Sequence, residues 1–142
     1  MIQVFYARGK TALIDSTIDL VNDTIKMGIL KDTYAVSTTS HQFWDDVSAY
    51  EIPAAGAYYS GGATLTNMAI TTVIADEEAK VDCDDIVLSF SAASMQYLVF
   101  YKDTTQATNS PLIAYVDLET PVSYDSEVLS VLVNSDGLIR VG

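Results

Sequence analysis

The chain has 142 residues, 49% of them hydrophobic, and seven lysines and arginines against nineteen aspartates and glutamates give a net charge of −12. A chain of this length is expected to form one domain (residues 1–142), which can bury about two thirds of its unfolded surface without disulfides or metals. The negative charge disfavours nucleic acid and anionic membranes as partners, and no apolar run approaches the roughly 20 residues of a membrane span. Cys83 is the only cysteine, and the amino terminus lacks a signal-peptide pattern, so we expect folding in the cytoplasm.

The first part of the chain contains one ambiguous segment and one strand. Residues 1–17 fit either an arm that begins with a strand at Ile2–Tyr6 or a short helix. In Thr24–Leu30, apolar side chains alternate with Lys26 and Gly28. This alternation predicts a strand that is buried on one face only.

The stretch His41–Asn67 is expected to form a long ordered loop. It holds the only tryptophan and the only histidine, and it contains no lysine or arginine. Ser40 is a candidate N-cap for a one-turn helix at Phe43–Asp46, and Tyr50–Ile52 is a candidate short strand. Three glycines mark sharp turns or close backbone approaches: Gly56, Gly61 and Gly62.

From residue 68 onward the pattern is typical of β structure throughout. Short segments with alternating or continuous apolar residues predict strands at 68–72, 81–90, 95–101, 112–117, 128–133 and 138–141. Met95–Tyr101 is apolar on both faces, which indicates a central strand. A turn at Asn134–Gly137 predicts a hairpin between the last two strands. About eight short strands therefore predict a mainly β fold, a single β-sandwich or barrel-like domain.

Residues that could perform chemistry are few. His41 could pair with Asp45 on a metal or with Cys83 as a nucleophilic couple, but a third partner at a recognisable spacing is missing. The carboxylates of Asp45–Asp46 and Asp82–Asp85 lack the alternate spacing of a calcium loop and fit solvated turns better. We therefore expect no enzyme activity, no cofactor, and no catalytic or metal-binding residues.

Aromatic residues concentrate in the central stretch: Phe43, Trp44, Tyr50, Tyr58 and Tyr59. Tryptophan and tyrosine are favoured at protein interfaces, so these five residues are candidate interface residues. They could equally fold back over the open end of the sandwich. Trp44, Tyr58 and Tyr59 could also stack on sugars.

Seven segments follow one another in a distinctive order: Thr24–Leu30 (TIKMGIL), Phe43–Glu51 (FWDDVSAYE), Tyr59–Leu65 (YSGGATL), Val81–Val87, Tyr97–Thr104, Ser110–Asp117 and Asp136–Ile139. Their order resembles that of motifs in a family of small tailed-bacteriophage virion proteins. The resemblance covers about Ile18 to Val141. It departs from the family pattern at Ala57, where family members usually have a glycine before the tyrosine.

The resemblance implies a non-enzymatic virion structural protein that is assembled in the host cytoplasm. Some members are considered capsid decoration or cement proteins, which implies the major capsid protein as partner and a homo-oligomer, such as a trimer. A neck or tail position in the same virion, with other virion proteins as partners, is the alternative. A carbohydrate-binding β-sandwich module is a third reading, from a different functional class.

Overall fold

The computed structural model describes residues 2–89, 93–124, 128–133 and 137–141, which form ten strands in three sheets, so the predicted mainly β fold is confirmed. The first sheet contains, in order, β1 (Ile2–Phe5), β8 (Leu112–Tyr124), β7 (Ala93–Lys102), β2 (Ile25–Lys31) and β3 (Ala63–Thr64). The second contains β10 (Ile139–Val141), β5 (Glu78–Asp82) and β4 (Ala69–Val73), and the third pairs β6 (Ile86–Ser89) with β9 (Val128–Val131). The paired strands run antiparallel.

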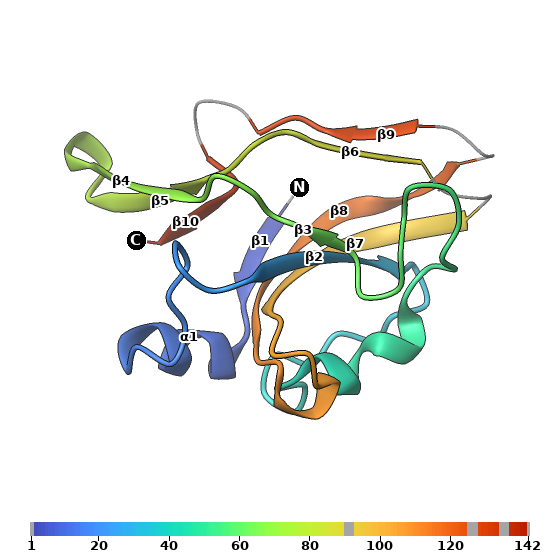
Figure 1. The fold of residues 1–142 in the computed structure, drawn as a ribbon, viewed down its shortest axis with the longest axis horizontal. Helices are drawn as coiled ribbons and strands as arrows, with labels where there is room; N and C mark the ends of the chain where they lie inside the picture. Colours follow the sequence, from blue (N-terminus) through green and yellow to red (C-terminus); the bar gives the residue numbers. More distant parts are fainter. Residues whose placement is uncertain (1, 90–92, 125–127, 134–136, 142) are drawn as a thin grey trace.

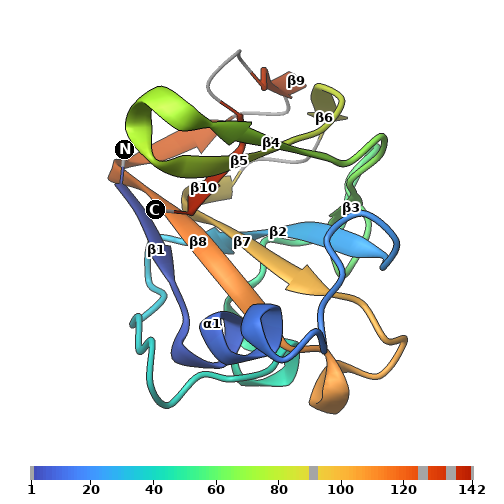
Figure 2. The ribbon, with the colours of Figure 1, turned by 90° about the vertical axis from the view of Figure 1, so that its left-hand side faces the viewer.

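The two smaller sheets lie over one face of the five-stranded sheet, as in a sandwich (Figures 1 and 2). Short 3₁₀ turns lie at the opposite face: η1 (Trp44–Asp46), η2 (Ser48–Tyr50) and η4 (Ala107–Asn109). A further turn, η3 (Ile74–Asp76), joins β4 to β5, and the helix α1 (Ala7–Ile14) follows β1. The five-stranded sheet is thus covered on both sides.

Different side chains fill the two faces of this sheet. Toward the smaller sheets the buried cluster is mostly aliphatic, with residues such as Met27, Ile29, Val81, Ile86, Ile113 and Ile139. On the other face the buried cluster is rich in aromatic residues: Tyr6, Tyr34, Trp44, Tyr97, Tyr101 and Tyr115. Leu98 and Phe100 of β7 point into the first cluster, and Val99 points into the second. The prediction that this strand is central is confirmed.

The strand β2 is buried on both faces, so the prediction of a half-buried strand is wrong. Its apolar row faces the smaller sheets, as the alternation indicated. The opposite face is covered by Trp44, whose ring lies so close to Gly28 that a Cβ atom there would overlap it. Gly28 therefore marks the close approach of a distant aromatic ring, and not a face of β2 that is exposed to solvent.

Both candidate structures for the first residues are present, one after the other. The strand β1 pairs with β8, and α1 begins directly after Tyr6. Gly9 of α1 is buried against the backbone of Ile113, where a Cβ atom would not fit. The glycine that weakens the helix signal in the sequence is thus required for the helix to pack on β8.

Two predicted connections are corrected by the structure. The strand β8 does not end before Glu119–Pro121 but continues to Tyr124, with an irregular register and a positive φ of 65° at Glu119. Such a bulge can accommodate Pro121 inside a long strand. The predicted C-terminal hairpin is also wrong, because β10 pairs with β5 and β9 pairs with β6. Gly137 has the expected positive φ, whereas 134–136 lie outside the described residues.

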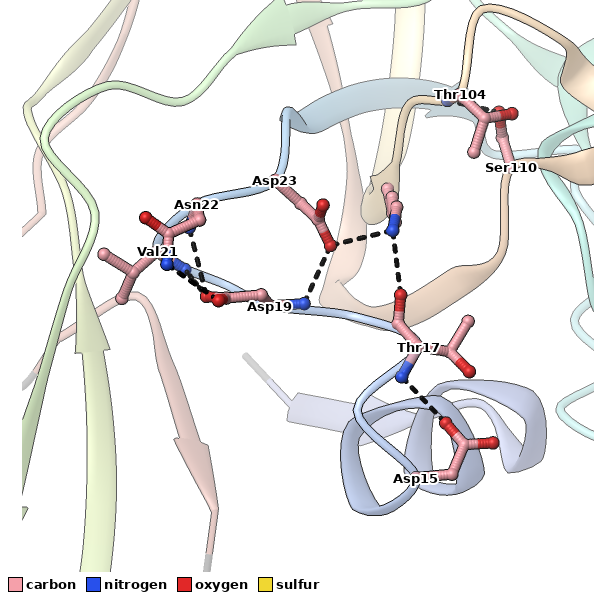
Figure 3. Close-up of polar contacts among 9 residues, drawn as sticks. Asp15, Thr17, Asp19, Val21, Asn22, Asp23, Thr104 and Ser110 are labelled. Carbon is pink, nitrogen blue, oxygen red and sulfur yellow. Dashed lines mark hydrogen bonds and ion pairs between the residues drawn. The ribbon is translucent and has the colours of Figure 1, made fainter.

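Figure 3 shows the connection between α1 and β2 (residues 15–24). It is held in place by Lys102 at the end of β7. Lys102 Nζ lies 2.9 Å from Asp23 Oδ2 and donates a hydrogen bond of 2.8 Å to the Thr17 carbonyl. Within the connection, the Asp19 carboxylate accepts hydrogen bonds from the backbone and side-chain N–H groups of Asn22. The carboxylates of this acidic segment therefore serve to shape a turn.

Candidate protein-binding surfaces

The second half of the central stretch is anchored on β2 by Glu51. The expected strand at Tyr50–Ile52 is reduced to an isolated bridge between Leu30 and Glu51, directly after η2. From there Glu51 Oε1 accepts hydrogen bonds of 2.7 Å from the Tyr58 hydroxyl and from the Gly61 N–H. Burial raises the pKa of Glu51 even though these donors favour the carboxylate.

Tyr58 links this loop to the backbone of β2. Its hydroxyl accepts a 3.0 Å hydrogen bond from the Ile29 N–H and donates one to Glu51. The side chain is fully buried, and burial raises the pKa of its hydroxyl. The three loop glycines have positive φ values: Gly56, Gly61 and Gly62. A Cβ atom at Gly56 or Gly62 would overlap neighbouring backbone, so the predicted close approaches are confirmed at these two positions. The loop is therefore an ordered cover for the strand β2.

Trp44 covers the other face of the sheet. Its ring stacks on Tyr101 with a centroid distance of 4.3 Å and an interplanar angle of 10°. Asp46 fixes the turn that carries it, because Asp46 Oδ2 accepts hydrogen bonds from the N–H groups of Gln42 and Phe43. Burial opposes ionisation of Asp46, but these two bonds outweigh it and hold the pKa below its usual value. The predicted N-cap Ser40 is wrong, because Phe43 occupies that position.

The sole histidine belongs to a cluster of tyrosines. His41 Nδ1 lies 2.8 Å from the Tyr34 hydroxyl, which is 3.1 Å from the hydroxyl of Tyr6. Burial raises the pKa of Tyr34 to about 12, and Tyr50 packs against the same ring at 5.2 Å. Cys83 lies in the aliphatic cluster, on the other side of the sheet from Tyr34. His41 and Cys83 are therefore not a nucleophilic couple.

Cys83 has the environment of an unreactive thiol. Burial and the neighbouring carboxylates of Asp82, Asp84 and Asp85 raise its pKa to about 11, which keeps the thiol protonated. The Asp84 carboxylate accepts hydrogen bonds from the side chains of Thr66 and Asn67 and thereby fixes a turn. Over the described residues, no group of three or more histidine, cysteine, aspartate or glutamate side chains could hold a metal ion.

The five aromatic interface candidates differ in exposure. Trp44 and Tyr58 are buried inside the molecule, Phe43 and Tyr50 are half-buried, and Tyr59 is 73% exposed. Trp44 and Tyr58 fold back into the domain, in the buried clusters on opposite faces of the five-stranded sheet. The interpretation that these aromatics cover the open end of the sandwich is met only in that the two side chains are buried. Tyr59 remains available for a partner.

Aliphatic side chains are exposed at one end of the molecule. This hairpin end consists of the β4–η3–β5 hairpin, β10 and α1, and Figure 2 faces it (Figures 1 and 2). Ile14 and Ile74 are each 86% exposed, and Ile70 is 53% exposed. A hollow of about 690 Å³ lies between α1 and β10, with Ile14 and Val141 on its walls. None of these residues is among the five interface candidates predicted from the sequence.

The two edge strands of the three-stranded sheet differ in how their outer backbone groups are hydrogen-bonded. At β10, the Gln3 side chain donates to the Arg140 carbonyl at 2.9 Å and accepts from the Arg140 N–H at 3.0 Å. This amide takes the place of a neighbouring strand and closes that part of the edge. At the other edge, β4 pairs only with β5 within the described part of the chain. The backbone edge of Ala69–Val73 that faces away from β5, the β4 edge, is therefore open there.

Comparisons of the chain with protein families, curated proteins and solved structures find no match. The resemblance to phage virion proteins therefore stays a prediction. None of the described helices is long and apolar enough to cross a membrane.

Proposed function

We propose that the chain is a non-enzymatic structural protein of a tailed-bacteriophage virion, and specifically a capsid decoration protein that binds the major capsid protein. The order of motifs from Thr24 to Ile139 supports the virion family. The binding role is supported by one observation, the exposure of Ile14, Ile70 and Ile74 at the hairpin end of a chain with a net charge of −12.

Burial of these side chains by a partner would contribute to binding in proportion to the area removed from water. An isoleucine that goes from exposed to fully buried contributes about 1.5–3 kcal/mol, before the entropic cost of association. Contacts of this size are modest for one copy. A homo-oligomer, with a trimer as the first state to test, would join several such contacts and raise the overall affinity through multivalency.

The direct test is to incubate purified protein with undecorated phage heads and to measure the mass of the particles. We expect a stoichiometric gain in mass that saturates with added protein. Heads that gain no mass at saturating protein would contradict the decoration role.

The runner-up role is a neck or tail position in the same virion. Labelled antibodies against the chain would bind evenly over the head of intact particles in the decoration role, and at one vertex or along the tail in the alternative. The carbohydrate-binding reading has little support, because Trp44 and Tyr58 are buried. A glycan array with a Trp44→Ala control tests it.

A further inference from the structure

We infer that the β4 edge is a docking edge that accepts an extended segment of a different protein as a further antiparallel or parallel strand. The segment has aliphatic side chains at alternate positions and basic residues at both ends. The identity of the partner as a virion protein rests on the proposed function. The docking edge and the chemistry of its partner rest on the exposure, register and charges of β4 and its surroundings.

The first observation is that β4 lacks the features that normally protect an edge strand. The segment from Asn67 to Ala75 reads NMAITTVIA and contains no charged residue and no proline, although 18% of the chain is charged. Its pairing with β5 is regular, without a bulge. Edge strands of proteins usually carry lysine, proline or a bulge, which prevent pairing with other chains. β4 instead consists mainly of β-branched residues, which favour strand pairing.

The second observation is that β4 extends beyond the core that covers β5. Ile70 lies directly opposite Val81 in the register, so both side chains are on the same face of the sheet. Val81 is 1% exposed, but Ile70 is 53% exposed. The inner face of β4 is therefore uncovered, and in Figure 1 the hairpin projects from the rest of the molecule. An added strand would extend the sheet and place its own aliphatic residues beside Ile70 on the same face.

Charge selects the kind of partner. Between Asn67 and Asp85 the chain has six acidic residues and one lysine. Asp76 and Glu77 lie at the turn end of β4, and Asp82 lies opposite Ala69 at its other end. Two copies of β4 in antiparallel pairing would bring these acidic ends together, which disfavours a second copy of this chain. A segment with lysine or arginine at both ends is complementary.

A peptide experiment tests the edge without phage particles. The probe is a synthetic peptide of alternating valine and threonine with lysines at both ends, and the control peptide has glutamates at both ends. We expect the lysine peptide to shift the amide resonances of Ala69–Val73 and to slow their hydrogen exchange. The affinity of the glutamate peptide should be at least about tenfold lower than that of the lysine peptide. Equal binding of the two peptides, or shifts that map elsewhere, would overturn the inference.

Variants connect the edge to the particle. Ile70→Lys places a charge on the inner face of β4, and Val87→Lys is the matched control at an aliphatic residue of β6 that is 60% exposed. We expect Ile70→Lys to weaken binding to heads by about tenfold or more, with Val87→Lys unchanged. Equal binding of Ile70→Lys and wild type would overturn the docking edge. So would self-association of the wild type that Ile70→Lys abolishes, because β4 would then pair with a second copy.

The two proposals fail in different ways. If the wild type does not bind heads but the lysine peptide binds at β4, the decoration role is wrong and the docking edge stands. If the wild type binds heads and Ile70→Lys binds equally well, the decoration role stands and the docking edge is wrong.

Discussion

The Tyr58→Phe substitution tests whether Tyr58 anchors the stretch His41–Asn67 on β2. The change removes one oxygen atom and leaves a ring of the same shape in a fully buried position. The lost hydroxyl accepts a hydrogen bond from the Ile29 N–H and donates one to Glu51. Ile29 is itself fully buried, so water cannot replace the missing acceptor without a rearrangement.

The expected loss of stability has two parts. A buried N–H without an acceptor costs about 1–3 kcal/mol, and the lost hydrogen bond to the Glu51 carboxylate adds about 1 kcal/mol after allowance for its partial exposure. Glu51 keeps the Gly61 N–H as a donor. We therefore expect Tyr58→Phe to lower the free energy of unfolding by about 2–4 kcal/mol.

The neighbouring tyrosine supplies a matched control. Tyr59→Phe makes the same chemical change at a side chain that is 73% exposed, and we expect it to stay within about 0.5 kcal/mol of the wild type. Urea denaturation of the three proteins measures both effects. An NMR titration gives a second readout, because loss of the Tyr58 donor should raise the pKa of Glu51 further. If the two variants unfold at the same urea concentration, Tyr58 does not anchor the loop.

Four further predictions concern packing, the pH dependence of stability and the α1–β2 connection. Gly28→Ala places a methyl group against the Trp44 ring, so we expect a loss of about 1–3 kcal/mol and a red shift of the fluorescence of this single tryptophan; unchanged emission would contradict the contact. Burial raises the pKa of Glu51 above its usual 4.5, so the folded state holds this proton more tightly, and wild-type stability relative to Glu51→Gln should rise as the pH falls from neutral toward 4.5. The pKa of Asp46 is lowered in the folded state, so its effect on stability runs in the opposite direction. The wild type should lose stability relative to Asp46→Asn as the pH falls from 3.8 to the lower pKa of the folded state. Denaturation curves against pH that do not diverge in these directions would refute the two assignments. Lys102→Gln should lower stability by about 1 kcal/mol and speed amide exchange in the α1–β2 connection, and unchanged exchange there would show that Lys102 does not hold it.

The elements that could be predicted from the sequence are those whose burial shows in their own residues. Met95–Tyr101 is apolar at nearly every position, and it lies at the centre of the five-stranded sheet. The position of β2 could be predicted from the sequence. Its burial on both faces could not, because Gly28 is covered by Trp44 from a distant loop. No local pattern in a strand reports which distant side chain will lie over it.

Strand pairing was less predictable than strand location. The last strand follows a sequence, NSDG, that is typical of a hairpin turn, yet it pairs with β5 and is joined to β1 through Gln3. Turn residues indicate where the chain reverses direction. The strand with which the following strand pairs depends on which sheet has an apolar face for it to cover. Ile139 is completely buried among residues of the aliphatic cluster, and this burial accounts for the pairing.

The candidate site was harder to predict than the fold, because residue type indicates packing and binding equally well. The rare and aromatic residues of His41–Asn67 attract attention in the sequence, but a connection that must cover a sheet needs large side chains for that purpose alone. Asn67–Ala75 carries no distinctive chemistry, and its signal is the lack of charge in a chain with a net charge of −12. That signal acquires meaning only when the sheet order makes β4 an edge and the register places Ile70 beyond the core. An uncharged run in a central strand is ordinary, whereas the same run at an open edge favours the addition of a strand.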